Sequence, residues 1–129
     1  MFHKEIISTD KAPAAIGPYS QAVRTGNLLF CSGQIPLDPA DPAAAFSPDV
    51  SIQAERVLQN IQGVLNSQGL TFDHVIKCTV FLTNLADFAV MNAVYSKYFT
   101  ANFPARSTIQ VAGLPRGANV EIEVIAAYP

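Results

Sequence analysis

Charged residues are scarce in this sequence. Asp, Glu, Lys and Arg make up 14% of its 129 residues, whereas an average globular domain has about 25%. Hydrophobic residues make up 50%, which excludes intrinsic disorder, because disordered chains combine low hydrophobicity with high charge. With so few charges a monomer would leave apolar surface exposed, so we expect a homo-oligomer built from a single domain, 1–129.

Several hallmarks of other protein classes are missing. There is no apolar run of about 18 residues, so we expect no membrane span. The charged N-terminus, 1–5, does not resemble a signal peptide, and we therefore expect a cytoplasmic protein. The net charge of −2 disfavours nucleic acid as a partner, because proteins that bind phosphates are normally basic.

Residues that usually hold metals or cofactors are few. Cys31 and Cys78 lie far apart in the sequence, which is too few for a disulfide scaffold or a zinc site of cysteines. His3 and His74 are not at HExxH spacing, and the sequence has no P-loop and no GxGxxG motif. We expect neither a metal nor a cofactor.

The apolar pattern predicts secondary structure in the order β-β-β-α-β-α-β-β. Alternation of period two and a Gly-Asn turn at 26–27 predict the first strands, and helical spacing predicts two helices. The expected strands are 4–8, 21–25, 28–33, 74–83, 107–111 and 120–127, and the expected helices are 51–68 and about 85–99. The stretch 36–48, rich in Pro and Ala, is expected to be a loop.

Capping residues stand near the ends of both helices. Ser47 or Asp49 would cap the first helix, and Gly69 stands where a left-handed residue commonly ends a helix. Asn84 is the expected N-cap of the second helix.

These elements predict an α+β fold, a mixed β-sheet with two helices packed on one face. In the last strand, one set of alternate residues is entirely apolar and suits the helix side, whereas the other set is half polar. The apolar set is Val120, Ile122, Val124 and Ala126, and the mixed set is Glu121, Glu123, Ile125 and Ala127. The mixed set fits a subunit interface that contains a site.

Arg106 is the first candidate site residue. It stands at the start of a mostly uncharged segment and is one of four arginines in the chain. A guanidinium on a rigid strand can bind a carboxylate through two parallel hydrogen bonds. A structural ion pair with Glu121 or Glu123 explains this arginine equally well.

Two further features are candidates for proton transfer or ligand binding. Glu121 and Glu123 would handle protons if a partly apolar interface raised their pKa values, although an exposed strand face or an inter-subunit salt bridge fits them better. The segments 17–19 (Gly-Pro-Tyr) and 31–34 (Cys-Ser-Gly-Gln) place polar groups beside accessible glycine backbone, although ordinary turns fit them better. Cys31 is expected to be a core residue, because no histidine is placed to activate it.

Several segments together resemble the RidA (YjgF) family of reactive intermediate deaminases. They are 14–22 (AAIGPYSQA), 32–36 (SGQIP), 77–83 (KCTVFLT), 103–108 (FPARST) and 120–123 (VEIE). The resemblance covers essentially the whole chain, with order and spacing preserved, and the Pro-Ala-Arg-Ser block together with Gly-Pro-Tyr is specific.

This resemblance implies a chorismate-mutase-like fold and a homotrimer, in which three sheets form a central barrel and active sites lie between subunits. It also implies a hydrolase that converts 2-imino acids, such as 2-iminobutanoate and 2-iminopropanoate, or their enamine tautomers, to 2-keto acids and ammonia. Such imines are released by pyridoxal-phosphate-dependent dehydratases, so the implied role is metabolite damage control.

The resemblance also implies roles for individual residues. Arg106 matches the family's carboxylate-binding arginine, and Glu121 matches the glutamate that positions or activates water. Tyr19 would assist proton transfer. The other residues that match the pocket are Ser32, Gly33, Asn92 and Thr108, the last through its main chain more than its side chain. This chemistry requires no nucleophilic side chain and no metal.

The sequence departs from the family pattern at two places. Residues 37–48 contain no glycine, where the family usually has a glycine turn, and Thr108 stands where some members have cysteine. Both would alter the substrate range more than the reaction. Two other functions compete with deamination: a non-catalytic regulatory module that binds keto acids, and an endoribonuclease, which the acidic charge balance disfavours.

Overall fold

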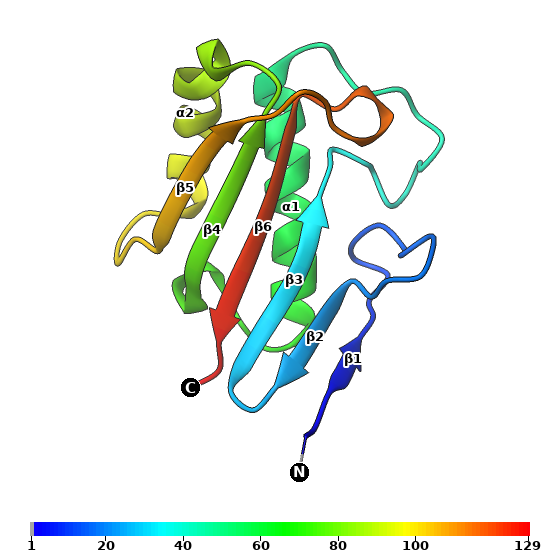
Figure 1. Cartoon of the computed structure of the whole chain (residues 1–129), viewed down its shortest axis with the longest axis vertical. Helices are drawn as coiled ribbons and strands as arrows, with labels where there is room; N and C mark the ends of the chain where they lie inside the picture. Colours follow the sequence, from blue (N-terminus) through cyan, green and yellow to red (C-terminus); the bar gives the residue numbers. More distant parts are fainter. Residues whose placement is uncertain (1) are drawn as a thin grey trace.

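A computed structural model describes residues 2–129 of the protein. Six strands form one mixed sheet in the order β1-β2-β3-β6-β4-β5, and both helices lie on one face of it (Figure 1). The strands are β1 (Glu5–Ile7), β2 (Ala22–Thr25), β3 (Leu28–Gln34), β4 (Val75–Leu82), β5 (Ala105–Gln110) and β6 (Val120–Ala127); the helices are α1 (Val50–Ser67) and α2 (Phe88–Tyr98). The predicted α+β fold class is confirmed.

The sheet combines local and distant strand pairs. β1, β2 and β3 form an antiparallel meander, whose second turn uses Gly26 at a φ of 59°. The last strand, β6, lies between β3 and β4 and is antiparallel to both. β5 is parallel to β4, and α2 makes the connection that a parallel pair requires.

Helix α1 follows its sequence signals closely. The Asp49 carboxylate caps it by accepting a hydrogen bond from the Ser51 amide at 2.9 Å, so Asp49 rather than Ser47 is the cap. Gly69 beyond its end has a φ of 70°, a conformation in which glycine costs least.

Two predicted boundaries are wrong. Helix α2 begins at Phe88 rather than near residue 85, because Asn84 caps a separate 3-10 turn, η2 (Leu85–Asp87), by accepting from the Ala86 amide. Strand β5 begins at residue 105 rather than 107, because its pairing with β4 already starts at Ala105. The tertiary pairing extends the strand to a position that follows Pro104 directly, which the local sequence does not indicate.

The hydrophobic core lies between the sheet and the two helices. Alternate residues of β4 and β6 point into it, as period-two alternation predicts. Its fully buried members include Leu58, Ile61, Leu65, Val80, Leu82, Met91, Val120 and Ile122. Burying one such side chain contributes about 1.5–3 kcal/mol to the free energy of folding. This layer therefore determines which face of each strand packs against the helices and which face points away from them.

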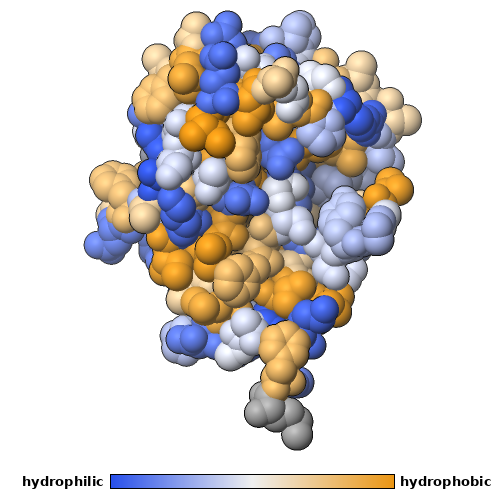
Figure 2. Space-filling view, viewed as in Figure 1, coloured by the Kyte–Doolittle hydropathy of each residue, from blue (hydrophilic) through white to orange (hydrophobic). Residues whose placement is uncertain are grey.

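The other face of the sheet carries no helix (Figure 1). Phe30 and Ile109 each expose 43% of their surface there, and Phe30 lies near the polar side chains of Lys77 and Glu123. Figure 2 shows hydrophobic and hydrophilic residues mixed over this face. The predicted half-polar character of this side of β6 is therefore confirmed.

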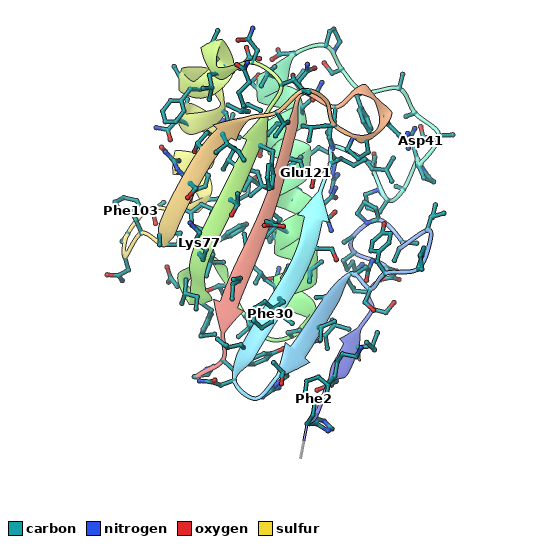
Figure 3. The ribbon with its side chains drawn as sticks, in the orientation of Figure 1. Phe2, Phe30, Asp41, Lys77, Phe103 and Glu121 are labelled. Carbon is teal, nitrogen blue, oxygen red and sulfur yellow. The ribbon has the colours of Figure 1, made fainter. Side chains whose placement is uncertain are left out.

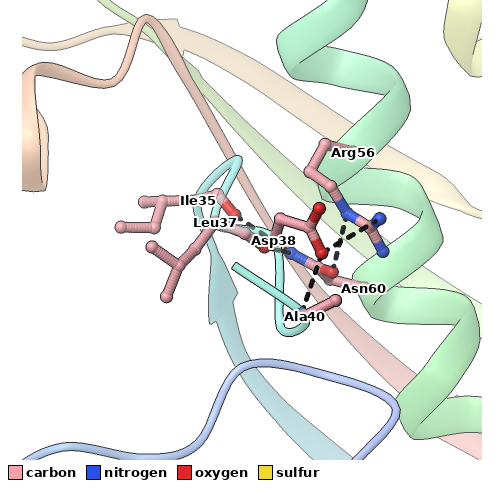
Figure 4. Close-up of polar contacts among 6 residues, drawn as sticks. All are labelled: Ile35, Leu37, Asp38, Ala40, Arg56 and Asn60. Carbon is pink, nitrogen blue, oxygen red and sulfur yellow. Dashed lines mark hydrogen bonds and ion pairs between the residues drawn. The ribbon is translucent and has the colours of Figure 1, made fainter. Parts of the chain in front are cut away.

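The segment between β3 and α1 is a loop, as predicted. Its first part is tied to α1 by the buried Asn60, whose Nδ2 donates to the carbonyl oxygens of Ile35 at 3.2 Å and Leu37 at 2.8 Å. Arg56 donates to Asn60 Oδ1 and pairs with Asp38 at 3.9 Å (Figure 4). These contacts fix where the loop leaves the sheet.

No helix within the described range, 2–129, has the length and apolar character needed to cross a membrane.

Candidate functional site

A pocket of about 600 Å³ lies where β3, the start of β6 and two connecting segments meet. Apolar groups form most of its wall, and Glu121 and Arg116 are its two charged residues. The lining residues are Pro13, Ala14, Ile16, Tyr19, Gln21, Ser32, Gly33, Gln34, Ile35, Leu37, Pro115, Arg116 and Glu121. Four of the predicted site residues, Tyr19, Ser32, Gly33 and Glu121, are thus brought together.

Glu121 is the carboxylate of this pocket. It points away from the helices, on the open face of the sheet (Figure 3). Partial burial raises its pKa above the ordinary range, and the nearby charge of Glu123 raises the pKa further. A carboxyl group in this setting exchanges protons closer to neutral pH than an exposed one, which suits acid–base work.

Gly33 makes room for the Glu121 side chain. A β-carbon at position 33 would lie 3.0 Å from the carboxyl carbon of Glu121 and closer still to one carboxylate oxygen. The strand is irregular here, because the register between β3 and β6 shifts between Cys31 and Gln34. The bulge and the missing side chain together let the carboxylate lie against the main chain.

Tyr19 and Ser32 occupy the same pocket in different ways. Tyr19 is 55% exposed, so its ring and hydroxyl are accessible to a ligand. The Ser32 hydroxyl donates to the carbonyl of Ser20 at 2.5 Å, so it holds the Tyr19 segment against β3. Ser32 therefore supports the pocket wall, and its oxygen retains acceptor capacity for a ligand.

Gln21 is a supporting residue that the sequence reasoning missed. It is buried, its Nε2 donates to the carbonyl oxygens of Thr9, Ala12 and Pro13, and its Oε1 accepts from the Thr9 amide at 2.7 Å. It thereby anchors the segment that supplies Pro13 to the pocket. Gln21 lies within 14–22, one of the segments that resemble the family, but only its burial in the structure reveals this supporting role.

Arg106 and Asn92 form a second group, away from this pocket. Arg106 Nη1 donates to Asn92 Oδ1 at 2.7 Å, and its guanidinium carbon lies 4.7 Å from the ring centroid of Tyr95. Both partners are on α2. They line a second pocket of about 330 Å³ with Ser96, Phe99, Phe103 and Pro104. Two predicted binding residues are therefore adjacent, in a setting that aligns the guanidinium.

Arg106 and Glu121 lie on opposite faces of the sheet. Arg106 contacts α2, whereas Glu121 belongs to the alternate set of β6 residues that point away from the helices. The ion pair of Arg106 with Glu121 or Glu123, considered above, does not form among the described residues, where the pair within 4 Å is Arg56–Asp38. One chain does not present both groups to one small substrate.

Thr108 lies two residues after Arg106, on the same face of β5, but does not line the second pocket. It pairs with Val80 of β4, and its Oγ1 is buried without a hydrogen-bond partner within residues 2–129. The two cysteines are buried, and burial raises the pKa of Cys31 to about 12, which fits the predicted core role. His74 accepts a hydrogen bond from the Thr71 amide and is a capping residue.

Metal ligands do not cluster in the described part of the chain. Across residues 2–129 there is no group of three or more His, Cys, Asp or Glu residues that could hold a metal ion.

Comparison with known proteins gives matches over most of the chain. The family model described as Endoribonuclease L-PSP matches residues 9–128. A 2-iminobutanoate/2-iminopropanoate deaminase from Bos taurus is 48% identical, over 95% of this chain and 89% of its own. Reactive Intermediate Deaminase A of Arabidopsis thaliana, a chloroplastic protein, is 50% identical over 95% of this chain and 65% of its own.

Solved structures agree with these matches. The crystal structure of E. coli TdcF with bound serine has a TM-score of 0.91 and 44% sequence identity, covering 97% of this chain and 99% of that one. The fold and the sequence therefore point to the same group of proteins.

Proposed function

The chain belongs to the endoribonuclease L-PSP family, to which the RidA (YjgF) deaminases belong, and we propose that it hydrolyses 2-imino acids to 2-keto acids and ammonia. The observation that carries the proposal is the Glu121 carboxyl group, whose pKa is raised within a pocket that also holds Tyr19 and Gly33. The expected substrates are 2-iminobutanoate and 2-iminopropanoate.

The reaction needs one carboxyl group and one water molecule. Water attacks the imine carbon, and Glu121 accepts a proton from it as the carbon–oxygen bond forms. Glu121 passes this proton to the imine nitrogen, and the new hydroxyl group gives up its own proton to the same nitrogen. The carbon–nitrogen bond then breaks as the carbonyl forms, and the products are ammonia and a 2-keto acid. Tyr19, accessible at the pocket wall, assists these proton transfers.

Arg106 would bind the substrate carboxylate. Its contacts are the neutral Asn92 and the rings of Tyr95 and Phe88, so its charge is not neutralised by a carboxylate within the described chain. Aligned in this way, it supplies orientation rather than bond breaking.

A complete site would then form between two copies of the chain, one supplying Arg106 and the other Glu121. The two residues face opposite sides of one sheet, which supports this arrangement. The exposed apolar residues on the open face and the low charge content favour burial of that face. We expect the chorismate-mutase-like trimer, with three such sheets around a central barrel and no need for a metal or cofactor.

The two competing functions predict a different site. A module that only binds keto acids has no use for a partly buried carboxyl group, because Glu121 would repel the bound carboxylate unless it transferred protons. An endoribonuclease would need to attract phosphates, and the net charge of −2 does not favour that.

Turnover of a freshly made imine tests the proposal. Threonine dehydratase generates 2-iminobutanoate, and semicarbazide traps whatever imine survives. The wild-type protein should suppress the trapped product, and Arg106→Ala should lose most of that effect, by about a hundredfold in kcat/KM for a bidentate carboxylate contact. Arg24→Ala, which removes an arginine outside both pockets, is the matched control.

The outcome decides between the three functions. If folded wild-type protein fails to suppress the trapped product from 2-iminobutanoate and from bulkier imines, the deaminase proposal is wrong. Binding of 2-oxobutanoate without turnover would then support the regulatory module. Salt-sensitive RNA binding that survives Arg106→Ala would support the endoribonuclease.

A further inference from the structure

Arg116 is a second arginine with access to the proposed catalytic pocket. It lines the cavity that contains Glu121, and these two are the charged residues of its wall. Neither the sequence pattern nor the reaction above gives it a role. It belongs to the short turn η3 (Pro115–Gly117), which precedes β6.

The backbone of this turn places Arg116 in an unusual conformation. Its φ is 57° and its ψ is 26°, which is the left-handed region that residues other than glycine rarely adopt. Gly117 follows with a φ of 71°. Such a conformation in an arginine beside a pocket is typical of functional positions, where the surroundings hold the strain.

The loop before α1 holds the guanidinium in place. Arg116 Nη1 donates to the carbonyl oxygen of Pro42 at 3.0 Å, and its guanidinium carbon lies 5.2 Å from the ring centroid of Phe46. Both partners belong to residues 37–48, the loop that lacks glycine. In Figure 1 this loop and the η3 turn lie side by side at one end of the sheet. The loop therefore fixes the guanidinium of a residue that lines the pocket.

The charge of Arg116 is not neutralised by the rest of the described chain. Between residues 2 and 129 the ion pair within 4 Å is Arg56–Asp38, so no carboxylate reaches Arg116. One guanidinium N–H is accounted for by Pro42, and an arginine has five. A held guanidinium with free donors is suited to a planar carboxylate.

We propose that Arg116 determines specificity by binding a distal carboxylate of the substrate. This inference rests on the proposed deaminase function. The substrate range then extends beyond the short 2-imino acids to 2-imino dicarboxylic acids, whose first carboxylate binds Arg106 of a neighbouring copy. Apolar wall residues such as Ile35, Leu37 and Pro115 contact the methylene groups between the two ends.

Two imines of equal chain length test this specificity. Flavin oxidases convert D-glutamate and D-norvaline to their 2-imino acids, catalase removes the peroxide, and semicarbazide traps the imine that remains. We expect wild-type protein to prefer the imine from glutamate. Arg116→Gln should lower kcat/KM for that imine about tenfold more than for the imine from norvaline, the effect of one partly exposed charged hydrogen bond.

Two further variants separate charge from structure. Arg116→Lys keeps the charge and should retain part of the preference. Arg24→Gln removes an arginine that lines neither pocket and should leave the ratio of the two rates at the wild-type value. If Arg116→Gln slows both imines equally, Arg116 merely anchors the loop and the inference is wrong.

Binding of the products distinguishes failure of this inference from failure of the proposed function. Calorimetry compares 2-oxoglutarate with 2-oxopentanoate, which lacks the distal carboxylate. If no imine is turned over, the deaminase proposal fails, and tighter binding of 2-oxoglutarate that Arg116→Gln abolishes still supports the distal subsite. Equal affinity of wild-type protein for the two keto acids overturns the subsite.

Discussion

At the scale of single residues, the close approach of Gly33 and Glu121 imposes the tightest constraint on the pocket. The carboxyl carbon of Glu121 lies 3.0 Å from the position that a β-carbon of residue 33 would take, and one carboxylate oxygen lies closer still. Any side chain there must displace Glu121, and a shift of about 1 Å in a reacting group can cost a hundredfold in rate.

Gly33→Ala should therefore lower kcat/KM for 2-iminobutanoate by about ten- to a hundredfold. The reason is displacement of the carboxylate rather than backbone strain, since the φ of Gly33 lies outside the left-handed region. Kinetics together with thermal unfolding measures the two effects separately, and we expect a much larger loss of activity than of stability.

Gly113→Ala is the matched control for this change. A β-carbon there would meet no described atom within 4 Å, and its φ is also outside the left-handed region. Equal activity of the two alanine variants would show that the contact at Gly33 does not matter for the reaction.

The sequence reveals some of these residues and hides others. Glu121 is visible because alternation along its strand separates it from Val120 and Ile122. Asn60 and Arg116 are not visible, because the first interrupts an otherwise apolar helix face and the second lies in a turn. Their roles depend on contacts with carbonyl groups of a distant loop, and no local pattern encodes such contacts.

At the scale of elements, α1 acts as the support of the pocket wall. Asn60 is fully buried and binds the carbonyl oxygens of Ile35 and Leu37, two residues that line the cavity. A buried carbonyl that loses its donor costs about 1–3 kcal/mol, so this one side chain links helix stability to pocket shape.

Asn60→Ala should lower the free energy of unfolding by about 2 kcal/mol. It should also raise KM, because the freed loop no longer holds Ile35 and Leu37 in place. Urea unfolding followed by steady-state kinetics measures both quantities. Asn66→Ala, an exposed position of the same helix, is the control, and an equal stability change in both variants contradicts the role given to Asn60.

The boundaries of the elements show which signals decide the fold. α1 and β6 are predicted almost to the residue, because the apolar period extends along the whole length of each. The starts of α2 and β5 are missed, because the η2 turn and the pairing with β4 set them. The sheet order depends on long-range pairing and cannot be read from local periodicity.

At the scale of the whole molecule, Arg106 and Glu121 lie on opposite faces of one sheet, so the proposed reaction needs an assembly that brings the two together. The low content of charged residues predicts burial of surface but does not identify the face. The structure adds that information, because the open face carries Phe30, Ile109 and the site carboxylate.

Mixing two inactive variants tests whether copies share the site. Arg106→Ala and Glu121→Gln should each lose most activity, and co-expression with two different tags should yield mixed oligomers. If one copy supplies Arg106 and another Glu121, mixed trimers should recover about a third of the wild-type activity, since one of the three sites in a cyclic trimer that holds both variants pairs two intact residues. Activity that stays at the level of the single variants would show that each chain uses its own two residues.

The central position of β6 has a consequence for the folding of the newly made chain. During synthesis, β3 is made about 90 residues before its partner β6. β4 likewise lacks β6 as a partner until that strand has been made. Until then two strand edges that are destined for the middle of the sheet stay unpaired, and such edges favour aggregation. Bringing strands so far apart in sequence together costs conformational entropy before the contacts between them can stabilise the pair. Because β6 also carries Glu121, the chain completes its sheet and gains its candidate catalytic carboxylate in the same step.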